Sequence, residues 1–345
     1  MKFINFNHYF QKNYLLILPL IAFTFLFLFR LDYNTIASWD EGWYGSIARE
    51  IVRSNNWLIL NWNGHPFYDH PPLGFYLMAI SYKLLGISEL STRLPSAIAG
   101  ILTIIFIYKL GCEVGKNKYI GFVSSLILGT SVWYLIRVRS GNLDALFVFF
   151  YTLVLYLSYK SSRNIKLLPI VTITFAALML TKTLVGISAL VPVTLLNSHH
   201  LKKVSRNYPY FILSLLLFFI VILPWYWVNY HQFPHFYYHH FVTVGSRNTS
   251  ISSLTTLKPT QPLFYLHMGV RKWYYPWILA LIYLLISRKF LKKEILIMLI
   301  TNLIILYPFL TSEKTEIWHL IPVYIPLAVL TASGSYFLEI GRAHV

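Results

Sequence analysis

The sequence is poor in cysteine and in acidic side chains. Its single cysteine, Cys112, excludes an internal disulfide and any cysteine-rich metal site. Only 12 of the 345 residues are Asp or Glu, and charged residues make up 12% of the chain. That charged fraction is about half of the roughly 25% found in soluble domains. No G-x-G-x-x-G fingerprint occurs, so the sequence gives no sign of a Rossmann-type nucleotide site. An ordinary soluble globular domain is therefore excluded.

Hydrophobic residues, by contrast, make up 57% of the chain, and the mean hydropathy is +0.57. Apolar stretches approach the roughly 20 residues that span a hydrocarbon core. The sequence predicts an all-α polytopic membrane protein with about ten transmembrane helices, forming a single domain over residues 1–338. The predicted spans are Tyr14–Phe29, Leu94–Leu110, Tyr119–Ile136, Leu143–Tyr159, Leu167–Leu180, Leu184–Leu196, Tyr210–Val228, Tyr275–Ile286, Ile295–Leu310 and His319–Phe337.

The net charge is +17. The positions of the basic residues indicate the orientation of the protein in the membrane and not a nucleic-acid site. Basic residues concentrate in short connections that all fall on one side of the predicted bundle. These are Lys109/Lys116/Lys118, Lys160/Arg163/Lys166, Lys202/Lys203/Arg206 and Arg288/Lys289/Lys292/Lys293. The positive-inside rule places this side and the N-terminus in the cytoplasm of a multi-pass cell-membrane protein. We therefore expect the lipid bilayer, and not nucleic acid, as the partner of this charge.

The opposite face carries two long polar and aromatic segments, residues 30–93 and 229–274, which we call the first and the later outer loop. Most of the acids lie on this face. Function is therefore expected on the extracytoplasmic side. Thr35 and Ala37 also fit a signal-peptide cleavage site after the first span, but that segment is long for a signal peptide.

The first outer loop predicts two surface helices. Apolar residues recur at helical spacing from Trp43 to Val52, which indicates an amphipathic helix lying on the membrane surface. Asp40 stands at its start, where a simple reading is a helix N-cap, with Ser38-x-x-Glu41 as a capping box. The double proline before Leu73 predicts entry into a second surface helix, Leu73–Leu85.

A series of short motifs follows in order along residues 36–330. In the first outer loop they are Trp39-Asp40-Glu41, Ala48-Arg49-Glu50, Asn63-Gly64, Asp69-His70-Pro71-Pro72-Leu73 and Ser91-Thr92-Arg93-Leu94-Pro95. Later motifs are Gly141-Asn142-Leu143-Asp144-Ala145, Thr181-Lys182, Pro224-Trp225-Tyr226, Ser312-x-Lys314-Thr315 and Trp318-His319-Leu320-Ile321-Pro322. Together they resemble the protein-mannosyltransferase and aminoarabinosyltransferase-like family of membrane glycosyltransferases, which have the GT-C fold.

The resemblance implies a cell-envelope enzyme that moves a hexose or pentose from a polyprenyl phosphate to a hydroxyl group. The acceptor would be a lipid, a glycan or a protein. Because a polyprenyl phosphate leaves as a stable anion, the enzyme needs one carboxylate to take the acceptor's proton and cations to hold the phosphate. The resemblance assigns catalysis to Asp40, Glu41 and Asp144, with Asp40 as the base of an inverting single displacement.

The resemblance also assigns a set of cationic or hydrogen-bonding residues to the donor phosphate. They are His70, Lys182, Arg247, Lys314 and His319. His70 stands where many relatives have lysine before the double proline, and His319 stands where many have tyrosine. Aminoarabinose specificity is therefore not implied, although histidine still donates a hydrogen bond to phosphate.

Plainer roles are open for several of these residues. Asp144 can serve as a helix cap, Lys182 can extend toward the membrane surface, and the cations at Arg247 and Lys314 can serve solubility. The three acids Asp40, Glu41 and Asp144 also leave open a divalent cation as cofactor.

Two further readings concern the whole chain. A transporter or flippase of polyprenyl-linked glycans would share the hydrophobicity and the phosphate contacts, but would favour paired charges at the bilayer midplane. A polymerase or ligase of surface glycans would share the donor chemistry.

Residues 339–345 read like a translated adapter, which predicts a non-native tail on a truncated C-terminus.

Overall fold

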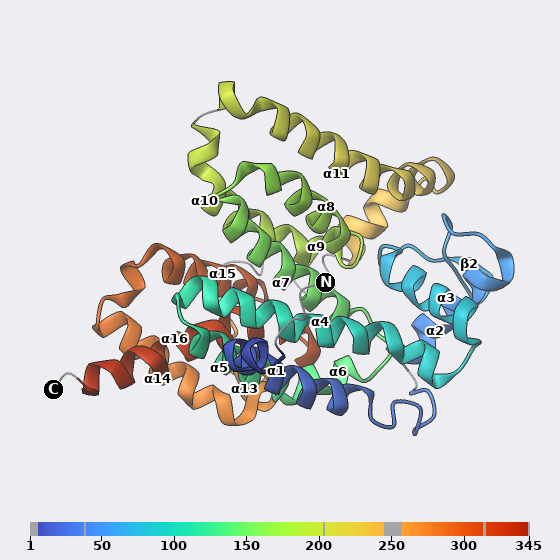
Figure 1. The fold of residues 1–345 in the computed structure, drawn as a ribbon. Coiled ribbons are helices and arrows are strands. Elements are labelled where there is room, and N and C mark those ends of the chain that lie inside the picture. The colour runs from blue at the N-terminus through green and yellow to red at the C-terminus, as the bar shows by residue number, and fades with distance from the viewer. Residues whose placement is uncertain (1–5, 38, 203, 245–256, 313–314, 344–345) are drawn as a thin grey trace.

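The computed structural model describes residues 6–37, 39–202, 204–244, 257–312 and 315–343, and these are almost entirely helical (Figure 1). The first half contains α1 (Phe6–Leu28), α2 (Asp40–Ser54), β1 (Asn61–Trp62), β2 (His65–Pro66), α3 (Leu73–Leu85), α4 (Glu89–Gly115), α5 (Lys118–Gly129), α6 (Val132–Val138), α7 (Asp144–Ser161), η1 (Ile165–Leu167) and α8 (Leu168–Met179). The second half contains α9 (Thr183–Gly186), η2 (Ile187–Ala189), α10 (Leu190–Leu201), α11 (Val204–Gln232), the π-helix η3 (Tyr238–Thr243), α13 (Thr260–Val270), η5 (Arg271–Trp273), α14 (Tyr274–Ile286), η6 (Lys289–Leu291), α15 (Lys293–Leu310), η7 (Ile317–Val323) and α16 (Tyr324–Ala343).

Every predicted span is helical, but the count of ten transmembrane helices is not confirmed. Among the described residues, four helical stretches are long and apolar enough to cross a membrane: Glu89–Gly115, Ser205–Gln232, Lys293–Leu310 and Ile317–Glu339. A fifth is obtained if α5 and α6, which are bent by 72° at their break, count as one span. The predicted span Leu184–Leu196 is divided among α9, η2 and α10, and α8 has only 12 residues. Interrupted and short helices therefore account for the difference.

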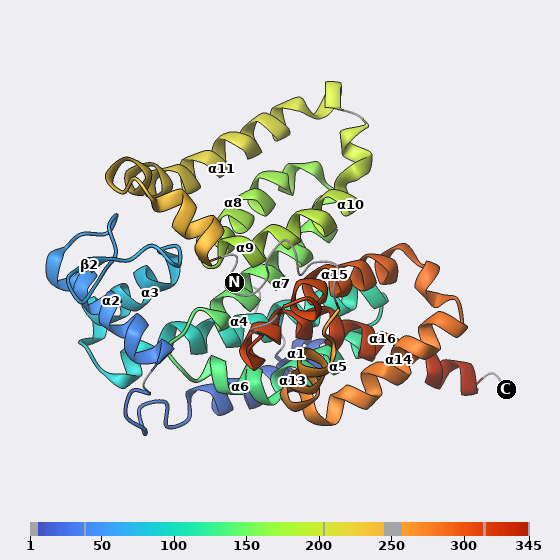
Figure 2. The same ribbon diagram turned by 180° about the vertical axis from the view of Figure 1, so that it is seen from behind.

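The helix α4 lies at the centre of the bundle. It packs against α1, α5 and α7, while α8, α10 and α11 form a group on one side and α13 to α16 a group on the other (Figures 1 and 2). Glycines allow α4 and α5 to approach closely, because a Cβ atom on Gly121 would lie 2.5 Å from the carbonyl oxygen of Tyr108.

The first outer loop folds into its own small apolar cluster. The predicted helices are present as α2 and α3, but the apolar face of α2 does not lie open to the membrane. Tyr44, Ile47 and Ile51 are buried against Phe75 and Met78 of α3. Our expectation that this face rests on the bilayer was therefore wrong, because α3 covers it. Between the two helices, Asn63 and Gly64 take positive φ values of 48° and 78° and close the hairpin of β1 and β2.

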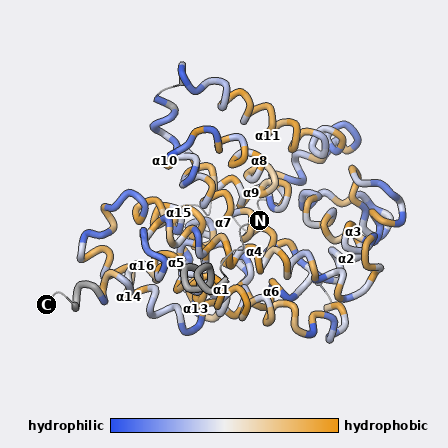
Figure 3. Tube along the Cα trace, viewed as in Figure 1, coloured by the Kyte–Doolittle hydropathy of each residue, from blue (hydrophilic) through white to orange (hydrophobic). Residues whose placement is uncertain are grey.

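At the other end of the helices the basic connections meet. Glu113, near the end of α4, accepts from Lys160 at 2.5 Å and from Arg163 at 2.8 Å, and Lys116 lies 3.9 Å from both Glu113 and Glu294. Two connections distant in sequence thus meet at Glu113, and Lys116 links them to the connection that holds Glu294. Figure 3 shows hydrophilic residues at this end of the bundle and again around β2, with hydrophobic helices between them.

Candidate active site

The helix α2 begins at Asp40, so this residue is not its N-cap. The N-cap position is Trp39, which has φ 74° and no capping side-chain bond. Ser38, the first member of the predicted capping box, lies outside the described residues. The carboxylate of Glu41 instead accepts a hydrogen bond from the backbone N–H of Ala37 at 2.8 Å. In the first turn of α2 the backbone N–H of Gly42 donates to the carbonyl of Ala37 at 3.0 Å, so the link between the helix and the preceding segment does not use the side chain of Asp40.

Glu41 is buried in a bidentate ion pair with Arg93. The two bonds measure 2.8 and 3.0 Å, and the backbone N–H of Gly141 adds a third at 2.8 Å. Burial raises the pKa of the Glu41 carboxyl, but the bonds from Arg93 and from the N–H groups of Ala37 and Gly141 outweigh it, so its pKa lies below the ordinary value. Glu41 therefore fastens α2 to α4 and to the loop before α7.

That loop positions Asp144 at the start of α7. The side chain of Asn142 accepts hydrogen bonds from the backbone N–H groups of Asp144 and Ala145, at 2.8 and 3.3 Å. Ser96 of α4 donates to the carbonyl of Asn142 at 3.1 Å. Since Asn142 satisfies the first N–H groups of α7, the side chain of Asp144 does not cap the helix and is available for other contacts.

Arg137 joins Asp40 and Asp144, two of the three acids that the sequence singled out. Its Nε lies 2.5 Å from Asp144, and its Nη2 binds Asp40. The other oxygen of Asp144 binds Lys182, which precedes α9. The guanidinium carbon of Arg137 also lies 5.3 Å from the centre of the Trp318 ring. The result is a continuous chain of ion pairs, Asp40–Arg137–Asp144–Lys182, drawn from four separate parts of the sequence.

The sequence reasoning did not single out Arg137. Arg137 follows the end of the predicted span Tyr119–Ile136, where a basic residue is an ordinary feature of a helix end. The available signal was its place next to an apolar span and near Asp144, because an ionisable residue at membrane depth is a functional candidate together with its partner.

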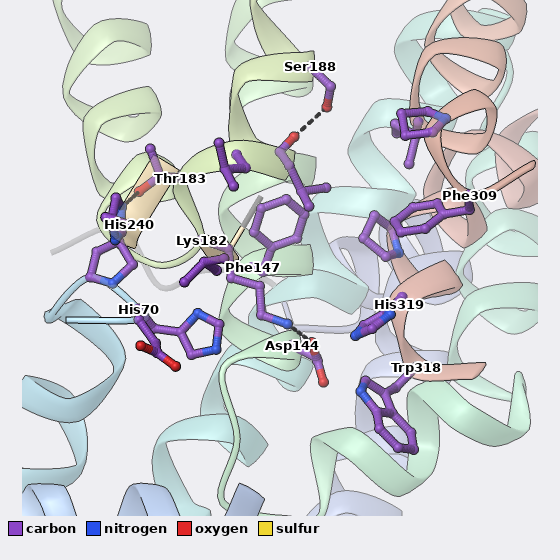
Figure 4. A pocket seen from close by; sticks show the side chains of 18 of the residues that line it. His70, Asp144, Phe147, Lys182, Thr183, Ser188, His240, Phe309, Trp318 and His319 are labelled. Carbon is purple, nitrogen blue, oxygen red and sulfur yellow. Dashed lines mark hydrogen bonds and ion pairs between the residues drawn. The ribbon is translucent and has the colours of Figure 1, made fainter. Parts of the chain in front are cut away.

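A cavity of about 380 Å³ opens beside this chain of ion pairs, with Asp144, Lys182, His70 and His319 at its polar end (Figure 4). Figure 4 shows the side chain of Lys182 extending between His70 and His319 toward Asp144. The rest of the wall is largely apolar and comes from α9 and α15, including Leu184, Val185, Ile304, Ile305, Pro308 and Phe309. The cavity thus combines a cationic end with an apolar wall.

Each of the two histidines can present one ring N–H when it is neutral. Burial and the nearby charge of Lys182 lower the pKa of His70 to about 3, so its ring is neutral near pH 7 and donates one N–H. The Nδ1 atom of His319 accepts the backbone N–H of Glu316 at 3.2 Å. A neutral His319 ring therefore carries its proton on Nε2.

The later outer loop is fastened to the first by two more histidines. His239 binds Asp69 at 2.6 Å, and His240 donates from Nδ1 to the carbonyl of Tyr68 at 2.8 Å. The Nε2 atom of His240 accepts from Thr183 at 3.1 Å, and burial lowers the pKa of this ring. These bonds place η3 over the loop that carries His70.

The structure places Asp144, Lys182, His70 and His319 in the wall of the cavity and links Asp40 to them through Arg137. Neither Asp40 nor Glu41 lines the cavity itself, and Glu41 faces Arg93. Arg247 and Lys314, also predicted to bind the donor phosphate, lie outside the described residues.

A divalent cation does not fit the three predicted acids in this arrangement. The guanidinium of Arg137 lies between Asp40 and Asp144, and Glu41 is held by Arg93. Within the part of the chain that the structure describes, no group of three or more His, Cys, Asp or Glu residues is placed to hold a metal ion. We derive no step through a metal.

Comparison with solved structures identifies the fold. The crystal structure of ArnT from Cupriavidus metallidurans in the apo state has a TM-score of 0.72 and 19% identity, covering 95% of this chain and 62% of that one. The same protein bound to undecaprenyl phosphate gives a TM-score of 0.71, also at 19% identity, with coverages of 97% and 63%. The described helices therefore have the fold of a membrane protein of the ArnT type.

Comparison of sequences points to the same group of proteins as the comparison of structures. The model of a family described as dolichyl-phosphate-mannose-protein mannosyltransferase matches residues 69–227. An uncharacterized protein of Aquifex aeolicus is 30% identical over 150 residues, 44% of this chain and 30% of its own length. Undecaprenyl phosphate-alpha-4-amino-4-deoxy-L-arabinose arabinosyl transferase 2 of Proteus mirabilis is 26% identical over 220 residues, 61% of this chain and 39% of its own length.

The predicted resemblance to GT-C glycosyltransferases of the protein-mannosyltransferase and aminoarabinosyltransferase-like type is thus confirmed. The match with these two sequence relatives extends over 30 and 39% of their lengths.

Proposed function

We propose that this chain is the membrane glycosyltransferase part of a protein that transfers a sugar from a polyprenyl phosphate to a hydroxyl-bearing acceptor on the outer face. The observation that carries the proposal is the position of Lys182. Its ammonium group binds Asp144, at the polar end of a cavity with an apolar wall. Such a cavity suits a ligand with a phosphate at one end and a hydrocarbon chain at the other.

The phosphate would be held by donors that are already in place. Lys182 has three N–H bonds, of which the contact with Asp144 occupies one, and His70 and His319 lie on either side of it (Figure 4). During transfer the bond between the anomeric carbon and the phosphate oxygen breaks, and the phosphate departs with the electron pair. The positive charge of Lys182 stabilises that departing anion.

Asp40 is the best placed of the three acids to act as the base. Glu41 is enclosed by Arg93, and Asp144 is bound by both Arg137 and Lys182, whereas the Asp40 side chain is 25% exposed and has Arg137 as its one ion-pair partner among the described residues. As the acceptor oxygen attacks the anomeric carbon, its proton passes to Asp40. Asp144 then still holds Arg137, so the site keeps its geometry when Asp40 becomes neutral. A single displacement of this kind inverts the anomeric centre.

The alternative of a glycan flippase receives less support. The ionisable chain lies at the start of α2, the end of α6, the start of α7 and the residue before α9. None of these four residues lies at the break between α5 and α6, whereas transporters form their ion sites at such breaks in discontinuous helices. We therefore infer an enzyme whose reaction takes place near one membrane surface.

The transfer reaction is tested with membranes that contain the full-length gene product. Labelled sugar on a polyprenyl phosphate should appear in a lipid, glycan or protein fraction. A nucleotide sugar should not replace this donor when the charging of the carrier lipid is blocked. Movement of an intact lipid-linked glycan without cleavage of the sugar–phosphate bond would favour the flippase.

The orientation is tested separately by labelling of introduced cysteines. Cysteines at Asn63 and Ser253 should react with an impermeant thiol reagent added outside, and one at Ser162 should not. Reversed labelling would place the acids in the cytoplasm and contradict the proposed site.

A further inference from the structure

A second cavity, of about 300 Å³, lies where α2 meets the start of α4. One wall is the face of α2 that carries Gly42, Gly45 and Arg49, and the other includes Ser88 and Glu89. Neither Asp144 nor Lys182 lines it, so the cavity is distinct from the proposed transfer site.

Two glycines, Gly42 and Gly45, leave the face of α2 toward this cavity without side chains at these positions. A Cβ atom on Gly42 would lie 3.1 Å from the carbonyl oxygen of Ala37, and one on Gly45 would lie 3.0 Å from the hydroxyl of Tyr82. Larger residues at these two positions would crowd their neighbours and reduce the space between α2 and α4.

The cavity carries one cation, Arg49, and one anion, Glu89, whose side chains have no hydrogen-bonded or ion-pair partner among the described residues. The third charged residue of the wall, Glu41, is by contrast fully engaged by Arg93 and by two backbone N–H groups. A ligand that enters the cavity thus meets a positive and a negative side chain whose hydrogen-bonding groups are not taken up by the described residues.

The rim of the cavity is apolar and exposed. Leu84 and Leu85 end α3 and Ile87 follows in the turn, where it lines the cavity; the three are 76, 54 and 56% exposed, and Leu90 at the start of α4 is 40% exposed. Several exposed apolar side chains close together in sequence, next to a polar cavity, are typical of a membrane-contacting surface. The ligand that matches both parts has a charged head and a hydrocarbon body.

We propose that this second cavity binds the head group of a phospholipid that carries both a phosphate and a primary ammonium group. Arg49 donates to the phosphate oxygens, Glu89 accepts from the ammonium, and the acyl chains lie over Leu84, Leu85 and Ile87. A choline head group cannot donate a hydrogen bond to Glu89, and a glycerol head group has no cation for it. The site therefore distinguishes among phospholipids, and it does so whether or not the chain transfers sugars.

The test uses the purified full-length protein and native mass spectrometry with an equimolar mixture of phosphatidylethanolamine, phosphatidylcholine and phosphatidylglycerol. We expect the ethanolamine lipid to be retained about tenfold over the other two, since one hydrogen bond between charged groups contributes roughly that factor. Glu89→Gln should remove this preference, and Arg49→Gln should weaken the retention of all three lipids. Arg53→Gln, on the same helix but outside the cavity, is the matched control and should change nothing.

Several results would overturn the proposal. The first is equal retention of the three lipids by the unaltered protein. The second is an unchanged preference in both cavity variants while their melting temperatures show that they are folded. The third is an equal loss in Arg53→Gln, which would indicate general surface charge. Soluble phosphoethanolamine should fail to displace the lipid at equal concentration, because it lacks the acyl chains; equal displacement would refute the role of the apolar rim.

Discussion

Replacement of Arg137 by glutamine is the most informative perturbation of the proposed active site. Arg137 is 12% exposed and binds one carboxylate that is 6% exposed and another that is 25% exposed. Removing one partner of a buried ion pair typically costs about 3–5 kcal/mol, because a buried charge is left uncompensated. Here Asp144 retains Lys182 and Asp40 retains contact with water, so we expect a smaller loss of about 2 kcal/mol in the free energy of unfolding.

The effect of Arg137→Gln on the reaction should exceed its effect on stability. Asp40 would lose the group that orients it, so kcat should fall by about 10²-fold, as for the loss of an oriented catalytic group, while the donor KM should change little. Arg137→Lys keeps the charge but cannot bridge two carboxylates with a rigid fork, so it should restore stability more than activity.

Arg139→Gln is the matched control for this substitution. Arg139 lies two residues away, but it donates to the carbonyls of Leu26 and Phe29 and contacts neither acid of the site. Transfer kinetics and thermal unfolding should be measured for all three variants in the same detergent. If Arg137→Gln keeps near-normal kcat and unfolding free energy, the bridge between Asp40 and Asp144 has no role in the reaction.

Further predictions concern the cations, the buried acid and the response to pH. Lys182→Ala should weaken binding of the polyprenyl-phosphate donor by about ten- to a hundredfold, as expected for a charge-assisted contact, and unchanged binding in a titration would show that Lys182 does not meet the phosphate. Glu41→Gln should lower the unfolding free energy by about 3 kcal/mol, because Arg93 loses its buried partner, and a melting temperature equal to that of the unaltered protein would argue against this role. The pKa of His70 falls from 6.5 in the unfolded chain to about 3 in the folded protein, so the unfolded state binds an extra proton between these values. Stability should therefore be complete above about pH 6.5 and should decline as the pH falls toward 3, with a weaker decline in His70→Gln in unfolding scans across this range.

The surface helices and the hairpin were predictable because their signals are local. The double proline and Gly86 bound α3 at Leu73 and Leu85, as predicted, and Asn63-Gly64 has the composition of a tight hairpin turn. The environment of α2 was not predictable in the same way. Its apolar face looks the same in sequence whether a membrane or another helix covers it, and α3 covers it here.

The candidate site could be predicted only in part. Asp40, Asp144 and Lys182 are far apart in sequence, so their association came from the resemblance to a family and not from spacing. Arg137 was missed because its two partners lie on other helices, and the 72° bend between α5 and α6 was not predicted from the sequence. The helix α13, Thr260–Val270, was also missed, since it lies within a segment that reads as the later outer loop.

The most direct test of the account is a single-turnover measurement on Asp40→Asn with a labelled polyprenyl-phosphate sugar. Asparagine keeps the size of the side chain and a hydrogen bond to Arg137 but cannot accept a proton. Glu50→Gln, on the same helix and without an ion pair among the described residues, is the control. The account predicts unchanged donor binding and a rate of transfer about 10²–10⁴-fold lower in Asp40→Asn, with Glu50→Gln unaffected. A folded Asp40→Asn protein that transfers sugar at a near-normal rate would contradict it and direct the search for the base to Asp144.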